Sequence, residues 1–117
     1  VKLHADKDKL ILAKNLIDSR LHQPPSLNEI CALIGINEYK LKRGFKEMFG
    51  QTVFGYMTDQ RLNLALNTVR DSQQSIAEIA FELGYATPQH FNNAFKKKFG
   101  RTPFLIRKNP DLAIVQA

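Results

Sequence analysis

The feature that most constrains the fold of this chain is a stretch of sequence that occurs twice, at positions 26–54 and 75–104. The residues shared by the two copies lie 49 positions apart in the first part and 50 in the second: Ser26/Ser75, Glu29/Glu78, Ile30/Ile79 and Gly35/Gly84, then Phe45/Phe95, Lys46/Lys96, Phe49/Phe99, Gly50/Gly100, Thr52/Thr102 and Phe54/Phe104. The spacing changes just after the shared glycine, as an insertion in a turn would produce. A repeat of this size indicates one supersecondary unit that is used twice.

Length and charge narrow the class of protein before any motif is considered. The 117 residues suffice for one domain, or for two small subdomains that share a connector. The net charge of +6, from 17 Lys and Arg against 11 Asp and Glu, favours a polyanionic partner, with nucleic acid ahead of a membrane surface. Cys31 is the single cysteine, so a disulfide scaffold is excluded and a cytosolic address is expected.

Two further features concern targeting and completeness. The sequence has no apolar run that approaches the length of a membrane span, so no membrane partner is expected. Val1 stands where an initiator methionine is usual, and we therefore expect the chain to be a piece of a longer protein.

Each copy of the repeat predicts a pair of helices joined by a short turn. In the first copy, Ser26 and Glu29 form a capping-box pattern at the start of a helix over 27–34. Gly35 suits the left-handed position that ends this helix, and a second helix is predicted over 38–49. The same signals recur in the second copy. This is the helix-turn-helix pattern, and its repetition makes it more specific than a single helical hairpin.

Helices are also predicted on either side of each copy. Apolar residues at helical spacing predict a helix over 5–22, which Pro24 and Pro25 would end. The expected organisation of the single domain 1–117 is a first helix-turn-helix subdomain at about 5–50, a linker helix at about 52–70, a second subdomain at about 75–108 that ends in a short helix over 102–108, and a loose tail at 109–117.

The second helix of each copy has one apolar face and one polar face. In the first copy the apolar face comprises Leu41, Phe45, Met48 and Phe49, and the polar face comprises Tyr39, Lys42, Arg43 and Lys46. In the second copy the corresponding faces comprise Phe91, Phe95 and Phe99, and Gln89, Asn92, Asn93 and Lys96. Asn and Gln can pair bidentately with adenine, and Arg and Lys with guanine, in a major groove that admits a helix. The polar faces therefore suit base readout.

The remaining basic residues suit contacts to phosphate. They lie on or beside the two polar helices and comprise Lys40, Lys46, Lys96, Lys97 and Arg101. The capped helix starts at Ser26 and Ser75 add backbone N–H groups and the positive end of a helix dipole. Taken singly, each lysine is equally well explained as part of an ordinary solvated surface.

These motifs resemble the DNA-binding domain of the AraC/XylS family of bacterial transcription regulators. The resemblance covers about 10–108 and rests on SLNEICALIGINEYKLKRGFKEMFGQT, on RLNLAL, and on SIAEIAFELGY followed by HFNNAFKKKFGRTP. Within the family, NEYKLKRGFKE with QTVFGY resembles regulators of siderophore uptake. The family resemblance implies an all-α fold of seven helices, in which two helix-turn-helix subdomains, a homeodomain-like pair, are joined by the long central helix. Each subdomain is then expected to insert its second helix into the major groove, about one turn of DNA apart.

Carried over position by position, the resemblance also implies base contacts. The positions are Tyr39, Lys42 and Arg43 in the first recognition helix, and Pro88, Gln89, Asn92 and Asn93 in the second. Pro88 brings no side-chain donor, which puts a base contact there in doubt. Lys42 and Arg43 are expected to prefer guanine and the amides adenine, whereas Tyr39 is expected to pack on a sugar or a thymine methyl group.

The resemblance further implies the partners of the protein. These are double-stranded promoter DNA, RNA polymerase, because most members are activators, and an effector-binding or dimerising domain outside this chain. No cofactor is implied, and the expected location is the cytoplasm, in association with the nucleoid.

Other residues of potential chemical interest favour structural roles. Cys31 lies on an apolar helix face and is predicted to pack in the core. His4, His22 and His90 share no metal-ligand spacing, so no metal site is expected. The sequence shows no nucleophile–base constellation, which argues against an enzyme.

Small and charged residues at two further places have predicted packing roles. Gly44 and the matching Ala94 lie at the edge of the core face, where the preceding helix is expected to approach closely. Asp59 and Arg61 lie on the linker helix, where an ion pair with a structural role is favoured over a contact with polymerase.

Two other classes of function stay open from the residues alone. A basic helical module that grips an acidic protein would show the same charged faces. Non-specific RNA binding is less favoured, because it commonly uses exposed aromatic residues and nearly all phenylalanines here are predicted on the core side.

Overall fold

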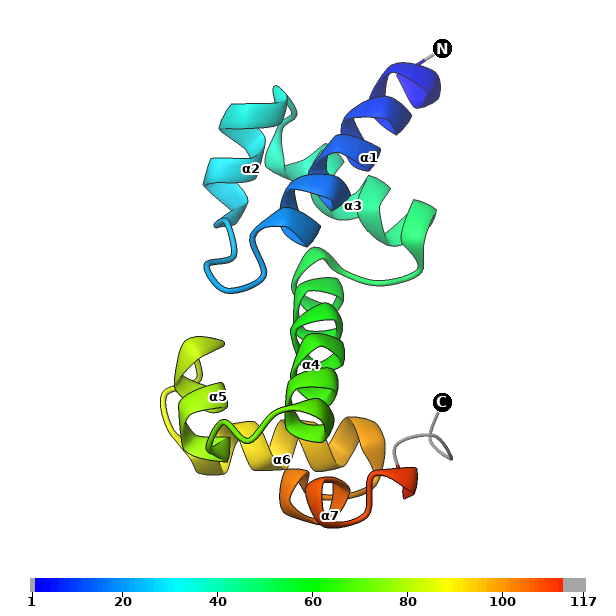
Figure 1. Cartoon of the computed structure of the whole chain (residues 1–117). Coiled ribbons are helices and arrows are strands. Elements are labelled where there is room, and N and C mark those ends of the chain that lie inside the picture. Colours follow the sequence, from blue (N-terminus) through cyan, green and yellow to red (C-terminus); the bar gives the residue numbers. More distant parts are fainter. Residues whose placement is uncertain (1, 113–117) are drawn as a thin grey trace. The chain divides into compact units, whose positions relative to one another are not determined.

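The computed structural model describes the backbone of residues 2–112 and the side chains of residues 6–112. These residues form seven helices and no strand, as Figure 1 shows: α1 (Lys2–Ser19), α2 (Leu27–Ile34), α3 (Glu38–Phe49), α4 (Val53–Asp71), α5 (Ile76–Glu82), α6 (Pro88–Phe99) and α7 (Pro103–Lys108). The predicted all-α fold with two helix-turn-helix pairs is confirmed. None of the helices described is both long enough and apolar enough to cross a membrane.

The helix boundaries agree closely with those predicted, except in α1, which begins at Lys2 rather than near residue 5 and also ends earlier than predicted. Helices α2 and α3 have the predicted bounds, and α4 and α7 each begin one residue later than predicted. Helix α1 ends at Ser19 rather than near residue 22, because the chain leaves the helix through two tight turns. The amide of Arg20 donates to the carbonyl of Ile17 at 3.0 Å, and the amide of Gln23 donates to that of Arg20 at 3.2 Å.

The segment after α7 differs from the loose tail that was expected, as far as it is described. Asp111 and Leu112 have helical backbone, and the amide of Leu112 donates to the carbonyl of Asn109 at 3.0 Å. The side chain of Leu112 is half-buried against neighbouring core residues. Residues 113–117 lie outside the described part of the chain.

Short polar residues begin most of these helices by accepting a backbone hydrogen bond. The side chains of Ser26, Asn37, Ser75, Thr87 and Thr102 each accept from the amide three residues further on. The caps predicted at Ser26 and Ser75 are therefore present. Asn37 and Thr87, which start α3 and α6, complete the same arrangement at the two helices with polar faces.

The capping box predicted at Ser26 is only half formed. Ser26 Oγ accepts from the amide of Glu29 at 3.1 Å, as predicted. The carboxylate of Glu29 accepts instead from Arg20 Nη1 at 2.6 Å. This charge-assisted bond lowers the pKa of Glu29 below its usual value.

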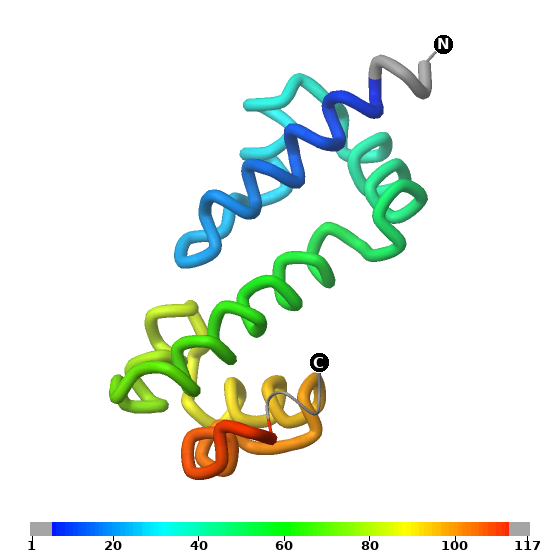
Figure 2. The backbone as a smooth tube through the Cα atoms, turned by 45° about the vertical axis from the view of Figure 1, so that its right-hand side comes forward, coloured from blue at the N-terminus to red at the C-terminus, as the bar shows by residue number. Residues whose placement is uncertain are grey.

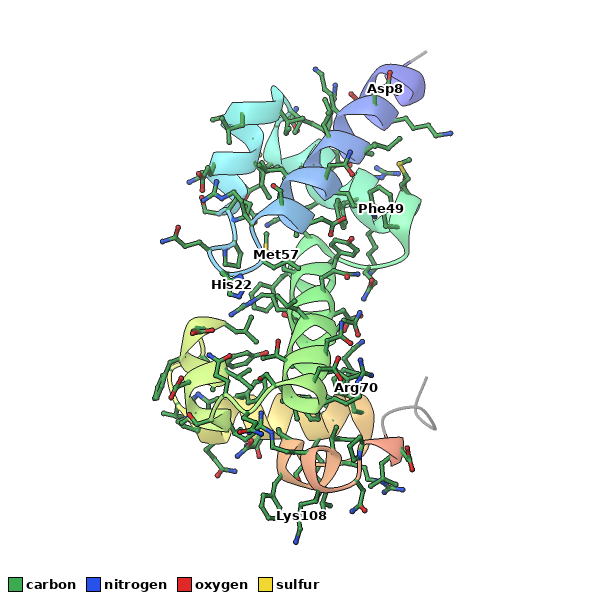
Figure 3. All side chains as sticks on the ribbon, viewed as in Figure 1. Asp8, His22, Phe49, Met57, Arg70 and Lys108 are labelled. Carbon is green, nitrogen blue, oxygen red and sulfur yellow. The ribbon has the colours of Figure 1, made fainter. Side chains whose placement is uncertain are left out.

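The described chain divides into two compact units, the first ending at Gln60 and the second beginning at Arg61. The boundary falls inside α4, so the helix predicted as a linker contributes side chains to both cores. Figure 3 labels Met57 in the first part of α4 and Arg70 in the second part. The first core comprises Leu10, Ala13, Ile17, Ile30, Ile36, Leu41, Phe45, Val53, Tyr56 and Met57. The second core comprises Leu62, Ala65, Val69, Ile79, Ala80, Leu83, Phe91, Phe95, Phe99 and Ile106.

The structural repeat is longer than the repeat that the sequence shows most clearly. Three buried positions of α1 correspond to buried positions 52 residues later, in the second part of α4. The pairs are Leu10/Leu62, Ala13/Ala65 and Ile17/Val69. Two buried positions early in α4 likewise correspond to buried positions 50 residues later, in α7. These pairs are Val53/Pro103 and Tyr56/Ile106. Each unit is thus a helix-turn-helix pair between a preceding and a following helical segment, and α4 supplies one segment to each unit.

In the first unit, α1 packs against both α2 and α3, and Figure 2 traces its path across them. Gly44 permits this close approach. The sequence predicts α2, the helix before α3, as the neighbour of Gly44, but the neighbour in the structure is Leu10 of α1. A Cβ atom added to Gly44 would lie 2.7 Å from Leu10 Cδ1, which is shorter than a normal contact. Ala94, at the matching position of α6, is half-buried against the second core.

Candidate nucleic-acid interface

The outer face of α3 is exposed because its opposite face is buried. Leu41 and Phe45 have no accessible surface, whereas the side chain of Tyr39 is 67% exposed. Lys42 and Arg43, which follow Tyr39 on the same face, are exposed as well. The structure therefore brings together on one surface the three residues predicted to read bases in the first copy.

A row of hydrogen bonds connects this face along the axis of α3. Arg43 Nη1 donates to the hydroxyl oxygen of Tyr39 at 2.7 Å, and Arg43 Nε donates to Glu47 Oε1 at 3.0 Å. The bond with Glu47, followed by the bond with Tyr39, raises the pKa of Arg43. The guanidinium is consequently held by side chains one turn away in both directions.

The same face carries carboxylates that the sequence reasoning missed. Lys42 Nζ lies 3.6 Å from Oε1 of Glu38, and Glu47 contacts Arg43 as described above. Each cation that is predicted to read bases is therefore paired with an acid, which the description of the polar face by its aromatic and basic residues alone left out. The signal was present in the sequence as Glu residues four positions before Lys42 and four after Arg43.

The outer face of α6 presents neutral amides. Gln89 Nε2 donates to Asn93 Oδ1 at 3.1 Å, and both side chains are exposed. Asn92 on the same helix is half-buried. Gln89 and Asn93 occupy the positions of Tyr39 and Arg43 in the other copy, so the same pair of positions is hydrogen-bonded in both units.

Basic residues are concentrated at the C-terminal end of α6. Lys96, Lys97 and Lys98 are exposed in its last turn, where the helix dipole favours positive charge. Lys98 Nζ also lies 5.6 Å from the centre of the Phe99 ring. In α3 the matching turn has a single basic residue, the exposed Lys46. The two outer faces therefore differ in charge as well as in residue type.

The other residues predicted to contact phosphate lie in different environments. Ser26 and Ser75 are exposed at the starts of α2 and α5. Lys40 Nζ lies 3.9 Å from Oδ2 of Asp6 on α1. Arg101 is half-buried after α6, and its Nε is buried without a hydrogen-bond partner among the described residues.

Two basic residues outside the predicted site lie against the turns of the two helix-turn-helix pairs. Lys9 Nζ donates to the carbonyl oxygen of Gly35 at 2.8 Å. The guanidinium of Arg61 lies 5.3 Å from the centre of the Tyr85 ring, and its Nη2 would be 3.0 Å from a Cβ atom on Gly84. Burial lowers the pKa of Arg61. Lys9 and Arg61 are 52 positions apart, like the core residues of their helices, so each turn is supported from the helix that precedes the pair.

The remaining candidates are one cysteine and three histidines. Cys31 is half-buried and packs against the first core, in line with its predicted role. His22 and His90 are exposed, and the side chain of His4 lies outside the described residues. Within the described chain, no three His, Cys, Asp or Glu side chains gather closely enough to hold a metal ion.

Comparison with known proteins identifies relatives over most of the chain. A family model described as a helix-turn-helix domain matches residues 30–109. The right origin-binding protein of Escherichia coli is 33% identical over 95 residues, which are 81% of this chain and 33% of that protein. The regulatory protein SoxS of Escherichia coli is 33% identical over 87 residues, which are 74% of this chain and 81% of SoxS. The chain thus spans about a third of the length of the first relative and most of the length of the second.

Solved structures show the same fold. An AraC-type transcriptional regulator from Chromobacterium violaceum superimposes with a TM-score of 0.82 at 27% identity, over 90% of this chain and 94% of that one. The DNA-binding domain of AdpA, solved in complex with a target DNA, superimposes with a TM-score of 0.79 at 19% identity, over 92% of this chain and 97% of that one. The second likeness concerns the fold alone. Matches of this extent show that the chain belongs to the AraC/XylS family of transcription regulators and is a DNA-binding domain of that family.

Proposed function

We propose that this domain reads a specific duplex sequence by placing the outer faces of α3 and α6 in the major groove. The observation that carries the proposal is the contrast between the two copies of the repeat. Apolar residues are buried at matching positions of the two copies, whereas the polar residues at matching positions of the outer faces differ: Tyr39, Lys42 and Arg43 in one copy, and Gln89, Asn92 and Asn93 in the other. Different side chains on the outer faces are expected where two similar units recognise different bases.

The chemistry of the two faces assigns a preferred base to each. The guanidinium of Arg43 and the ammonium of Lys42 donate to the acceptors O6 and N7 of guanine. The amides of Gln89, Asn92 and Asn93 can both donate and accept, as the N6 and N7 atoms of adenine require. Each well-formed bidentate pair discriminates against a wrong base by about 1–3 kcal/mol. Because the two faces differ, one chain should bind an asymmetric site and not a palindrome.

Contacts to phosphate are assigned to residues that flank these faces. They comprise the helix starts at Ser26 and Ser75 and the side chains of Lys40, Lys46, Lys96, Lys97 and Arg101. Such contacts hold the domain in register without reading sequence. Each phosphate that is neutralised makes affinity more sensitive to salt, through the release of bound counterions.

The regulatory role is proposed from the family. The domain would act as the promoter-binding part of an activator, in contact with RNA polymerase, within the cytoplasm and on nucleoid DNA. An effector-binding domain outside this chain would control it. The known relatives support a role in transcription regulation, since they include the regulatory protein SoxS and an AraC-type regulator.

Selection of bound sequences from a random duplex library tests the proposal directly. We expect a two-part motif without internal symmetry, with guanine prominent in one part and adenine in the other, and an affinity that falls steeply with added salt. The absence of binding to any duplex at low salt would contradict the proposal. In that case the basic faces would be better explained by an acidic protein partner.

A further inference from the structure

The two recognition helices carry the same row of outer positions, with one difference in charge. The rows are Tyr39, Arg43 and Glu47 in α3, and Gln89, Asn93 and Lys97 in α6. The first two members are hydrogen-bonded to each other in both helices, at 2.7 Å and 3.1 Å. The third member in α3 is the acid Glu47, which accepts a hydrogen bond from Arg43. The third member in α6 is the base Lys97.

Glu47 is an unexpected residue for a surface that faces DNA. Its carboxylate repels phosphate, and its exposed pair with Arg43 contributes little to folding, because water and salt screen both charges. Neither non-specific affinity nor stability therefore accounts for an acid at this position. What the carboxylate does in the structure is to bond the Nε of the residue predicted to read guanine.

The bond to Glu47 restricts which edge of the Arg43 guanidinium can meet a base. A guanidinium can present two parallel donors either from Nε and Nη2 or from Nη1 and Nη2. Glu47 engages the Nε–H, and Tyr39 engages one hydrogen of Nη1. Because Glu47 occupies Nε, the edge formed by Nε and Nη2 is closed to a base, and the edge formed by Nη1 and Nη2 is the one that can meet the paired acceptors of a guanine.

We propose that Glu47 is a specificity-determining positioning residue, which fixes Arg43 end-on toward a guanine and keeps it from turning to the phosphate backbone. The proposal rests on the proposed function, in which Arg43 faces a base pair. Without Glu47, Arg43 gains the freedom to contact phosphates of any sequence, so discrimination falls while non-specific affinity rises. Lys97, at the matching place in α6, leaves the amide row without such a constraint.

The test compares Glu47→Ala, Glu47→Gln and Glu47→Lys with the unchanged protein. Affinities are measured for the selected duplex, for the same duplex changed at the base pair that Arg43 reads, and for a duplex of unrelated sequence. We expect Glu47→Ala to lower discrimination at that base pair at least about fivefold and to raise affinity for the unrelated duplex. Glu47→Lys should raise that affinity further, whereas Glu47→Gln keeps an acceptor for Nε and should retain discrimination to within about twofold.

Glu38→Gln supplies the matched control, because Glu38 is the other exposed acid of this face and pairs with Lys42 instead. It should raise affinity for the unrelated duplex as Glu47→Gln does, without changing discrimination at the base pair of Arg43. If Glu47→Ala keeps full discrimination while Arg43→Ala abolishes it, Glu47 contributes only charge and the inference is overturned, although the proposed function stands. If Arg43→Ala also keeps full discrimination, the assignment of Arg43 itself is wrong and both proposals fail.

Discussion

Arg43 and Asn93 occupy the same position in the two copies of the repeat, yet their neighbours give them different chemistry. Arg43 is held between a phenol and a carboxylate, and Asn93 accepts from an amide. Both are exposed, so neither contributes to a core. At the scale of single residues, the outer faces of the two copies differ in exposed polar side chains that are not needed to build either core.

Replacement of Arg43 and of Lys96 by alanine should have different consequences. Arg43→Ala should lower preference at one base pair by roughly fivefold or more, because a bidentate contact is lost. Lys96→Ala should weaken binding to all sequences about equally and reduce the salt dependence by the contribution of about one phosphate. Binding titrations on the selected duplex and on single base-pair variants, at several salt concentrations, distinguish these results. A uniform loss of affinity in both variants would show that Arg43 does not read a base.

Two turn glycines offer a comparison in which only the surroundings differ. Gly35 and Gly84 both have positive φ, at 78° and 85°, so alanine is strained at either place by about 1–2 kcal/mol. A Cβ atom on Gly35 meets nothing within 4 Å, whereas one on Gly84 lies 3.0 Å from Nη2 of Arg61. Gly84→Ala should therefore lower the free energy of unfolding, measured with urea, by more than Gly35→Ala does. Equal losses would mean that the side chain of Arg61 yields freely.

At the scale of elements, each of the helices α3 and α6 is defined at both ends and anchored along one side. Asn37 and Thr87 cap the starts of α3 and α6, and a glycine with positive φ follows the end of each. Burial of Phe45 in α3 and of Phe91 and Phe95 in α6 fixes which face turns outward. The following helical segment closes each core, through α4 in the first unit and α7 in the second.

The contact that closes the first core should make its stability dependent on alkaline pH. The hydroxyl of Tyr56 donates to Asp18 Oδ1 at 2.6 Å, and burial, followed by this bond, raises the pKa of Tyr56 above 10.0. Lys14 Nζ also faces the ring, 5.5 Å from its centre. Because the folded pKa is the higher one, the contribution of the neutral hydroxyl is complete below about pH 10 and is lost as pH rises through the folded pKa.

Tyr56→Phe measures this contribution. The variant should lose about 1 kcal/mol of unfolding free energy at neutral pH, because a partly buried hydrogen bond to an exposed carboxylate is removed. The difference between the two proteins should shrink as pH rises above about 10. Urea unfolding at a series of pH values checks both expectations, and a difference that stays constant into strongly alkaline solution would contradict the assigned cause.

At the scale of the whole molecule, α4 is a single helix that belongs to two cores. Tyr56 and Met57 are buried in the first core, and Leu62 and Ala65 in the second, with the division between Gln60 and Arg61. If the domain reads a two-part DNA site as proposed, we expect an interruption of this helix to weaken binding to that site. The side chain of Gln60, at the division between the units, is not among the residues of either core.

The variant Gln60→Pro tests whether DNA binding depends on an uninterrupted α4, separately from the folding of the two cores. Gln60→Pro should interrupt α4, at a local cost of about 3 kcal/mol, because proline lacks the amide hydrogen and clashes with the preceding turn. Each core should persist, whereas affinity for the two-part site should fall at least about tenfold, toward that of a single unit. Gln60→Ala, which preserves the helix, should bind as the unchanged protein does. Circular dichroism and binding titrations provide the two readouts, and undiminished affinity in Gln60→Pro would contradict the expectation.

Much of the candidate site was predictable because the repeat aligns its exposed positions. Helical periodicity placed Tyr39, Lys42 and Arg43 on one face, and the structure confirms that they are exposed together. The spacing of four residues allowed a bond between Arg43 and Glu47 but did not decide it, since the partner of a long side chain depends on its rotamer and on competing groups. The roles of Tyr39, Lys42 and Arg43 in base contact stay predictions until binding is measured.

The sequence by itself determined the helices, the caps at Ser26 and Ser75 and the duplicated helix-turn-helix unit, because these depend on local spacing and on residues such as Ser26 and Gly35 whose preferences act within one turn. Only the tertiary structure decided that α4 serves two cores, that Leu10 of α1 fills the space beside Gly44, and that Lys9 supports the first turn. These are contacts between residues distant in sequence. They are decided by packing among several helices, which no local preference specifies.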